Sequence, residues 1–150
     1  MVPVALRRRL RSERGAELLE FALVLPLLLL VLAGILDMGF LFKDYEVVTN
    51  AAREGARMAS LPGWLESDVK TRVNSYLTAG GFQGVANTTV SSVVIADGNG
   101  RTIRGVKVLV EAPHTYLILG PIVQLIQTTA VPMTTLRAAA TMRAEVAAGL

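Results

Sequence analysis

The hydrophobic pattern of the chain is dominated by one apolar run near the N-terminus. Phe21–Leu36 holds sixteen residues without a charged or strongly polar side chain, and beyond Asp37 the apolar character continues to Phe42. As a helix, this longer stretch would be roughly 33 Å long, enough to cross a hydrocarbon core of roughly 30 Å. A helix that is apolar on every side has no face for water, which disfavours a buried core helix. The pattern therefore predicts one membrane span, over about residues 18–42.

The helical pattern continues beyond the span. It runs to Leu61, where Pro62-Gly63 ends it. Apolar residues at helical spacing predict a short second helix over Ser67–Thr78, and the two glycines at 80–81 are its expected end. The first 80 residues are thus expected to be helical almost throughout.

The C-terminal half changes to the pattern of β-strands. Thr88–Ala96 and Thr102–Glu111 are rich in β-branched residues, and the sequence DGNG between them is a strong hairpin signal. Residues 131–146 favour a last strand, although two central alanines leave a helix as the alternative. Together the elements predict an α+β fold: a long N-terminal transmembrane helix, a short second helix, and a small antiparallel sheet of three to four strands.

A second apolar stretch lies between the predicted strands. Tyr116–Ile126 has eleven residues, is broken by Gly120-Pro121, and is too short to cross a bilayer. It is either part of the core of the C-terminal domain or an exposed patch for a partner. Of these two alternatives, we favour core.

Positive charge is concentrated in the first tenth of the chain. The net charge of the 150 residues is +3, but residues 1–15 hold five arginines against one glutamate, a net +4, and the remainder carries −1. Basic residues directly before a span orient it with its N-terminus in the cytoplasm. We therefore expect the chain beyond about residue 43 to be exported, and we expect no nucleic-acid partner.

Composition and motifs exclude most catalytic chemistry. The chain has no cysteine and a single histidine, which excludes disulfide scaffolds, thiolate metal sites and multi-histidine centres. It has no phosphate-binding glycine-lysine motif and no nucleophile elbow. His114 is expected to be a structural or surface residue. The sequence thus predicts no enzyme, no cofactor and no metal.

Two carboxylates stand at the start of the apolar helix. Glu17 and Glu20 lie between the basic segment and the leucine-rich run. Negative charge in a first turn interacts favourably with the helix dipole, which is the ordinary explanation. A carboxylate in hydrocarbon costs about 2–3 kcal/mol even on lenient scales, so we favour a more specific role.

About a third of the chain, residues 13–60, resembles the TadE-like proteins of tight-adherence (Tad) pilus systems, whose N-terminus is of the type IV prepilin kind. The resemblance rests on RGAELLEFALVLP, on the apolar run after it, and on NAAREGAR at 50–57. It includes these non-hydrophobic or helix-breaking positions: Gly15, Glu20, Pro26, Asn50, Arg53, Glu54, Gly55 and Arg57. One departure is Leu19, where β-branched residues are common in the family.

The resemblance implies a processing site and an assembly residue. Gly15 would be the last residue of a cleavable basic leader, residues 1–15, and Ala16 the first residue left by a prepilin peptidase. Glu20 would then pair with the Ala16 amine of a neighbouring subunit, because opposite charges neutralise each other in a low dielectric. The mature chain would consist of a long helix, residues 16–61, and an exported α+β domain, residues 62–150.

The segment NAAREGAR at 50–57, called the second motif below, is expected, together with Pro26, to serve helix packing or a subunit interface. The residues assigned to this role are Pro26, Asn50, Arg53, Glu54, Gly55 and Arg57. Alanines and a glycine at four-residue spacing give the same segment one narrow face suited to close packing. Two alternatives remain equal, because the spacing does not separate them. The segment is either a core stripe of small residues with a solvated charged face, or a subunit interface.

The function implied by the resemblance is structural. The chain would be a minor pilin or pseudopilin of a Tad-type (type IVc-like) pilus, acting in initiation, assembly or at the tip, and hence in adhesion or secretion. Its expected partners are a prepilin peptidase, other minor pilins and the major pilin, the inner-membrane assembly platform and the lipid bilayer.

The expected location is the bacterial inner membrane, in a single pass with the N-terminus cytoplasmic and the exported domain periplasmic or on the cell-surface pilus. Two alternatives remain. One is an uncleaved membrane-anchored binding module that does not polymerise. The other is a secreted protein whose first forty residues are an unusual signal.

Overall fold

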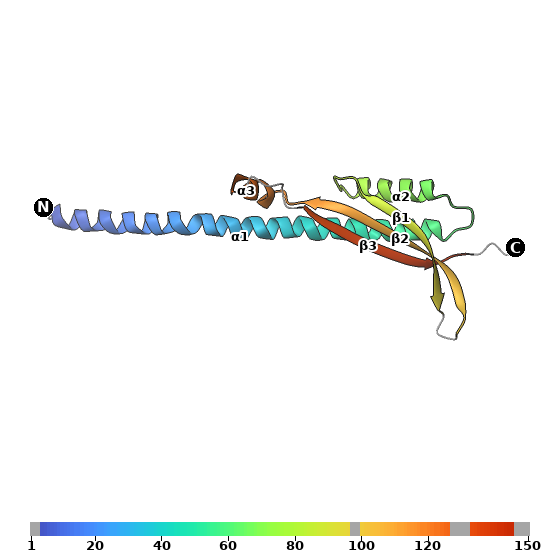
Figure 1. The fold of residues 1–150 in the computed structure, drawn as a ribbon. Coiled ribbons are helices and arrows are strands. Elements are labelled where there is room, and N and C mark those ends of the chain that lie inside the picture. The colour runs from blue at the N-terminus through green and yellow to red at the C-terminus, as the bar shows by residue number, and fades with distance from the viewer. Residues whose placement is uncertain (1–3, 97–99, 127–132, 146–150) are drawn as a thin grey trace.

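Six elements make up the part of the chain that the computed structural model describes, residues 4–96, 100–126 and 133–145. In chain order they are α1 (Val4–Ala59), α2 (Glu66–Ala79), β1 (Asn87–Ala96), β2 (Thr102–Thr115), α3 (Leu119–Ile126) and β3 (Met133–Arg143). Figure 1 shows one long helix whose C-terminal part carries a small head, formed by α2 and the sheet. The predicted α+β fold is confirmed, and its sheet has three strands.

The helix α1 is 56 residues long and passes through Pro26 without a break (Figure 1). Its leucines and alanines are strong helix formers. It ends at Ala59, and Gly63, with a φ of +80°, lies in the turn that follows. From Val4 onward the predicted leader is therefore continuous with the helix. The N-terminal half of α1 projects away from the head.

The sheet has the strand order β1-β2-β3, and both pairs are antiparallel. The predicted hairpin joins β1 to β2, with Ala96 opposite Thr102. Gly100 has a φ of +80°, a conformation that glycine adopts without steric cost. The rest of the predicted turn, residues 97–99, lies outside the described residues. For residues 131–146, β3 confirms the strand over Met133–Arg143.

The core of the head forms where the C-terminal third of α1 packs against both α2 and the sheet. Small residues of α1, every fourth residue of α2 and alternate residues of β2 meet there, because helix faces repeat about every 3.6 residues and strand faces every two. The main contributors are Val48, Ala51, Ala52, Ala56 and Ala59 of α1, Val69, Val73 and Leu77 of α2, and Val106, Val108 and Val110 of β2.

The apolar stretch 116–126 does not join this core, so its assignment as core of the C-terminal domain is wrong. Leu117 and Leu125 are 68% and 91% exposed. The stretch forms α3, which lies beside the apolar part of α1 on the N-terminal side of the sheet (Figure 1). Hydropathy alone did not reveal this position, because the contact that holds α3 comes from a residue 80 positions away, described below.

Gly55 is the point where α1, α2 and β2 come closest together. A Cβ added at Gly55 would lie 2.6 Å from Cγ2 of Val73 and 3.3 Å from Cγ1 of Val108. Both valine side chains belong to fully buried residues. The narrow face of α1 thus serves packing inside the chain at this position.

We expect Gly55→Ala to destabilise the head by about 1–3 kcal/mol, because overpacking displaces buried valines and outweighs the better helix propensity of alanine. Thermal unfolding of the detergent-solubilised chain, followed by the fluorescence of Trp64, measures the effect, since Trp64 packs against the core. Gly39→Ala is the control, because a Cβ at Gly39 meets nothing within 4 Å. Equal melting temperatures for the two variants would contradict the close contact.

Candidate functional site

The predicted processing segment lies on the exposed N-terminal half of α1. Residues 15–20 are all exposed, and a side chain added at Gly15 would meet nothing within 4 Å. Glu20 forms no ion pair or hydrogen bond with any other side chain that the structure describes. Gly15 and Ala16 are therefore accessible from outside, and the Glu20 carboxylate is available to a partner.

The apolar surface of α1 has almost no partner within the chain. Leu23 is 74% exposed, and the most apolar 18-residue window of the helix is only 6% buried. By length and composition α1 can cross a membrane, because its leucines and valines would face hydrocarbon. This surface is consistent with a single-pass membrane anchor.

Asp37 interrupts the apolar surface and is only 1% exposed. Its Oδ1 accepts hydrogen bonds from the backbone N–H of Leu117 at 3.1 Å and of Ile118 at 3.0 Å. Its Oδ2 accepts one from the N–H of Leu119 at 2.7 Å and a longer one from Ile118 at 3.3 Å. One carboxylate of α1 thus binds three consecutive N–H groups at the start of α3.

These hydrogen bonds pair the N–H groups at the start of α3 with the buried carboxylate of Asp37. Either would be unfavourable if it were left unpaired. The first N–H groups of a helix have no acceptor within the helix, and a residue just before the helix normally supplies one. The residues before α3, Leu117 and Ile118, have no polar side chain, and Asp37 supplies the acceptor from α1 instead. The positive end of α3 in turn stabilises the buried carboxylate.

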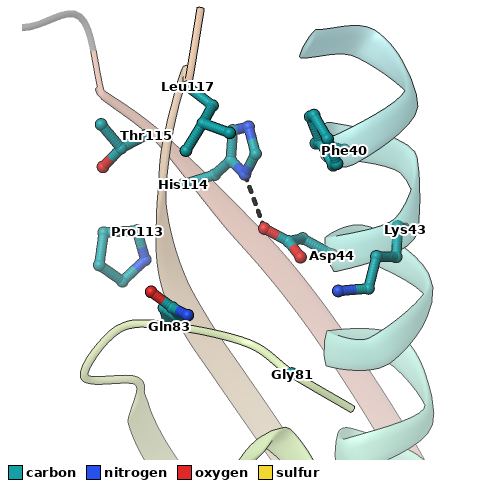
Figure 2. A pocket seen from close by; sticks show the side chains of 9 residues that line it. All are labelled: Phe40, Lys43, Asp44, Gly81, Gln83, Pro113, His114, Thr115 and Leu117. Carbon is teal, nitrogen blue, oxygen red and sulfur yellow. Dashed lines mark hydrogen bonds and ion pairs between the residues drawn. The ribbon is translucent and has the colours of Figure 1, made fainter. Parts of the chain in front are cut away.

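A second buried contact joins α1 to β2 two helical turns further on. His114 is 4% exposed, and its Nδ1 lies 2.8 Å from Oδ2 of Asp44. Figure 2 shows this pair on the wall of a cavity of about 430 Å³ between β2 and α1. The rings of His114 and Tyr116 are nearly perpendicular, with centroids 5.4 Å apart. Of the two expected roles of His114, this burial and pairing favour the structural one.

The charged residues of the second motif form two separate contacts. Glu54 accepts hydrogen bonds from Nε and Nη2 of Arg57 at 3.0 and 2.9 Å, and from Nε and Nη2 of Arg72 at 3.0 and 2.8 Å. These bonds, those from Arg57 first, lower the pKa of Glu54 from 4.5 to about 2. On the same helix, Nη1 of Arg53 donates to Oδ1 of Asn50 at 3.2 Å.

The residues assigned to helix packing therefore lie in three different places. Gly55 is in the core, and Pro26 lines a groove between α1 and α3. Glu54 and Arg57 join α1 to α2 through Arg72. Asn50 and Arg53 lie away from the core, and a subunit interface at these two residues stays a prediction.

Sequence reasoning missed Asp37, Asp44 and Arg72 as structural residues. A signal for the first two was present, because Asp37 and Asp44 are seven residues apart, or about two turns, and Asp44 is four residues from Val48 and seven from Ala51 on the same helix. They thus continue the buried stripe of α1 toward the apolar segment. The partner of Glu54 had no such signal, since Arg72 lies on another helix, 18 residues away.

The described residues contain no group of three or more histidine, cysteine, aspartate or glutamate side chains placed to hold a metal ion. The cavity beside His114 has one cation, Lys43, and one carboxylate, Asp44, at its helix side (Figure 2). The carboxylate is already paired with the histidine. The pair of Asp44 and His114 therefore joins α1 to β2.

These features define an α+β protein with one apolar helix long enough to cross a membrane. Residues 15–57 match the family model described as TadE-like protein, which confirms the resemblance stated above over nearly the same residues. The match includes Gly15, Asp37, Gly55 and Arg57. Comparison with curated proteins found no match, and neither did comparison with solved structures.

We expect Asp37→Ala to release the start of α3, because three N–H groups lose their acceptor at about 1–3 kcal/mol for each buried group left unpaired. Hydrogen exchange at the amides of Leu117–Leu119, measured on the full chain in detergent, should become faster. Glu46→Ala is the control, since Glu46 is an exposed acid on the same helix. Unchanged exchange in Asp37→Ala would contradict the capping role.

We expect the contribution of Glu54 to stability to depend on pH. Its pKa is lower in the folded chain, about 2 against an ordinary 4.5, so the unfolded chain takes up the proton first as the pH falls. The stabilisation is full above about pH 4.5 and is lost toward pH 2. Wild type should therefore melt above Glu54→Gln at pH 6, and the difference should shrink on acidification and with added salt. A gap that is constant from pH 6 to 2 would contradict this assignment.

Proposed function

We propose that the chain is a minor pilin or pseudopilin of a Tad-type pilus, processed by a prepilin peptidase between Gly15 and Ala16. The observation that carries the proposal is the TadE-like match over residues 15–57, at the start of a helix whose apolar surface is uncovered. The role would be structural and not catalytic. It would lie in the initiation or assembly of the pilus or at its tip, and through the pilus in adhesion or secretion.

The charge distribution supports an N-terminus that is cytoplasmic before cleavage. The five arginines of residues 1–15 would each hold the leader at an anionic leaflet by about 1 kcal/mol. Removal of the leader would leave the amine of Ala16 and the carboxylate of Glu20 at the end of the apolar helix. A helix with that end can leave the bilayer for an assembly more easily than one held by a net charge of +4.

The position of the head supports assembly through α1. The core involves only the C-terminal third of the helix, and the leucine-rich part is left exposed. In the membrane this surface would contact lipid, and in an assembly it would pack on the helices of other pilins. The Glu20 carboxylate, which is exposed and has no partner among the described side chains, would there pair with the Ala16 amine of a neighbour.

The proposed partners follow from these steps. A prepilin peptidase would act on Gly15 at the cytoplasmic face of the inner membrane. The inner-membrane assembly platform would extract the mature helix, and the major pilin and other minor pilins would pack on it. The head would then lie in the periplasm or on the pilus.

Sequencing of the mature N-terminus, in cells that assemble the pilus, tests the proposal. Wild type should begin at Ala16, and Gly15→Ala should keep residues 1–15. The fold should not change in this variant, because a Cβ at Gly15 meets nothing within 4 Å. Glu20→Ala should be cleaved but absent from the pilus fraction, whereas Glu17→Ala should be cleaved and assembled.

Each other result identifies an alternative. An intact N-terminus in wild type would indicate an uncleaved membrane-anchored binding module. A mature chain that begins beyond Asp37 would indicate a secreted protein with an unusual signal. Normal cleavage of Gly15→Ala together with normal assembly of Glu20→Ala would contradict the assigned roles of both residues.

A further inference from the structure

The helix α3 lies at the depth of the predicted membrane span. A groove of about 470 Å³ between α1 and α3 is lined by Pro26, Leu29 and Leu36 on one side and by Ile118 and Ile122 on the other. These α1 residues fall within the predicted span, residues 18–42. Figure 1 places α3 beside this part of α1, beyond the end of the sheet.

The composition of α3 suits hydrocarbon and not water. Among residues 117–126, Gln124 is the one polar side chain. Leu125 is 91% exposed and Leu117 is 68% exposed. Two leucines left in water beside an exposed apolar helix would form a patch of the kind that marks a partner or a membrane.

Asp37 supplies acceptors for the N–H groups at the start of α3, which would disfavour insertion into lipid if they were unpaired. In hydrocarbon every backbone N–H needs an acceptor, because water is absent. The three N–H groups of Leu117, Ile118 and Leu119 all donate to the carboxylate of Asp37. The carboxylate is itself screened from lipid, since it is only 1% exposed.

The surface of α3 is continuous with that of the anchor. Ala33 of α1 is buried although Leu32, Ile35 and Leu36 near it are exposed, and it lies in the groove beneath α3. Where α3 covers α1, part of the apolar surface of α1 is hidden. The outer side of α3, which includes Leu125, presents another apolar surface in its place. Apart from the exposed Gln124, the described surface at this depth is therefore apolar, and acyl chains match it without any specific partner.

We propose that α3 is a second membrane-inserted element, which enters the half of the bilayer nearest the head, lies against α1 and contacts acyl chains. The inference rests on the proposed function only in taking α1 as a membrane anchor. The anchor would then consist of a spanning helix and a short helix that enters and leaves on the same side. Asp37 would fix the depth of the head, and α3 would have to leave the bilayer together with α1 during assembly.

Single-tryptophan fluorescence tests this placement on the full chain. Trp64→Phe removes the native indole, and one tryptophan is then introduced by Leu125→Trp in α3. Two control variants carry the single tryptophan elsewhere. One has it in α1, by Leu29→Trp, and the other on the exposed surface of β1, by Val94→Trp. Each variant is reconstituted into phosphatidylcholine–phosphatidylglycerol vesicles, with and without brominated acyl chains.

We expect the indoles at positions 29 and 125 to emit at shorter wavelength than the one at 94 and to lose most of their emission to brominated lipid. Quenching at 29 but not at 125 would overturn the proposal and leave the anchor intact. A blue-shifted but unquenched indole at 125 would mean that protein covers α3, which also overturns it. Absence of quenching at 29 would instead overturn the membrane anchor itself.

A further variant tests the part assigned to Asp37. Adding Asp37→Ala to the Leu125→Trp chain should reduce quenching at position 125, because the freed N–H groups disfavour hydrocarbon. The same change in a chain whose tryptophan is introduced by Leu23→Trp, outside the groove between α1 and α3, should leave quenching at 23 unaltered, which shows that α1 is still inserted. Full quenching at 125 without the carboxylate would overturn its role in holding α3 in the bilayer.

Discussion

The close approach of α1 to α2 and β2 around Gly55 is the contact on which the head depends. The absence of a side chain there lets Val73 and Val108 meet the helix backbone from two different elements. Alanines fill the neighbouring positions of the same stripe. Because the described part of the head has no long second helix or second sheet to enclose a core, α1 supplies that surface, and small residues allow α2 and the sheet to pack against it together.

The buried stripe of α1 continues beyond this core, and its chemistry changes with its surroundings. Toward the N-terminus it passes through Val48 and then through the carboxylates of Asp44 and Asp37, which bind His114 and the start of α3. Acids on a buried stripe are costly unless they are paired. Asp44 is paired with the end of β2 and Asp37 with the start of α3, so the chain that runs from β2 into α3 is held at two points along one helix face.

One helix therefore has two kinds of surroundings. Its C-terminal third is covered by the head, its leucine-rich part is uncovered, and Asp37 stands between the two. A pilin-like role requires this division, because the exposed part must exchange lipid for other helices while the head keeps its fold. The match to the TadE-like model spans both parts, from Gly15 to Arg57.

Local sequence patterns sufficed for much of the fold. Leucine content predicted the apolar helix, the spacing of apolar residues predicted α2 over Ser67–Thr78, and the DGNG turn predicted the pairing of β1 with β2, since each depends on residues close together in the chain. The candidate processing segment, from Gly15 to Glu20, was inferred from the resemblance to TadE-like proteins, and its cleavage stays a prediction. The last strand was predicted less firmly, because its alanines favour a strand only where α1 lies against them.

The contacts between distant residues were decided by the tertiary structure alone. Asp37 binds N–H groups 80 to 82 residues away, and Arg72 reaches Glu54 from another helix. Composition identified 116–126 as apolar but did not say whether protein or lipid surrounds it, because hydropathy is the same for both. By itself the sequence determined which segments are apolar and where α1, α2 and the hairpin of β1 and β2 form. The packing of β2 and α3 along α1 decided which polar groups are buried and what each one binds.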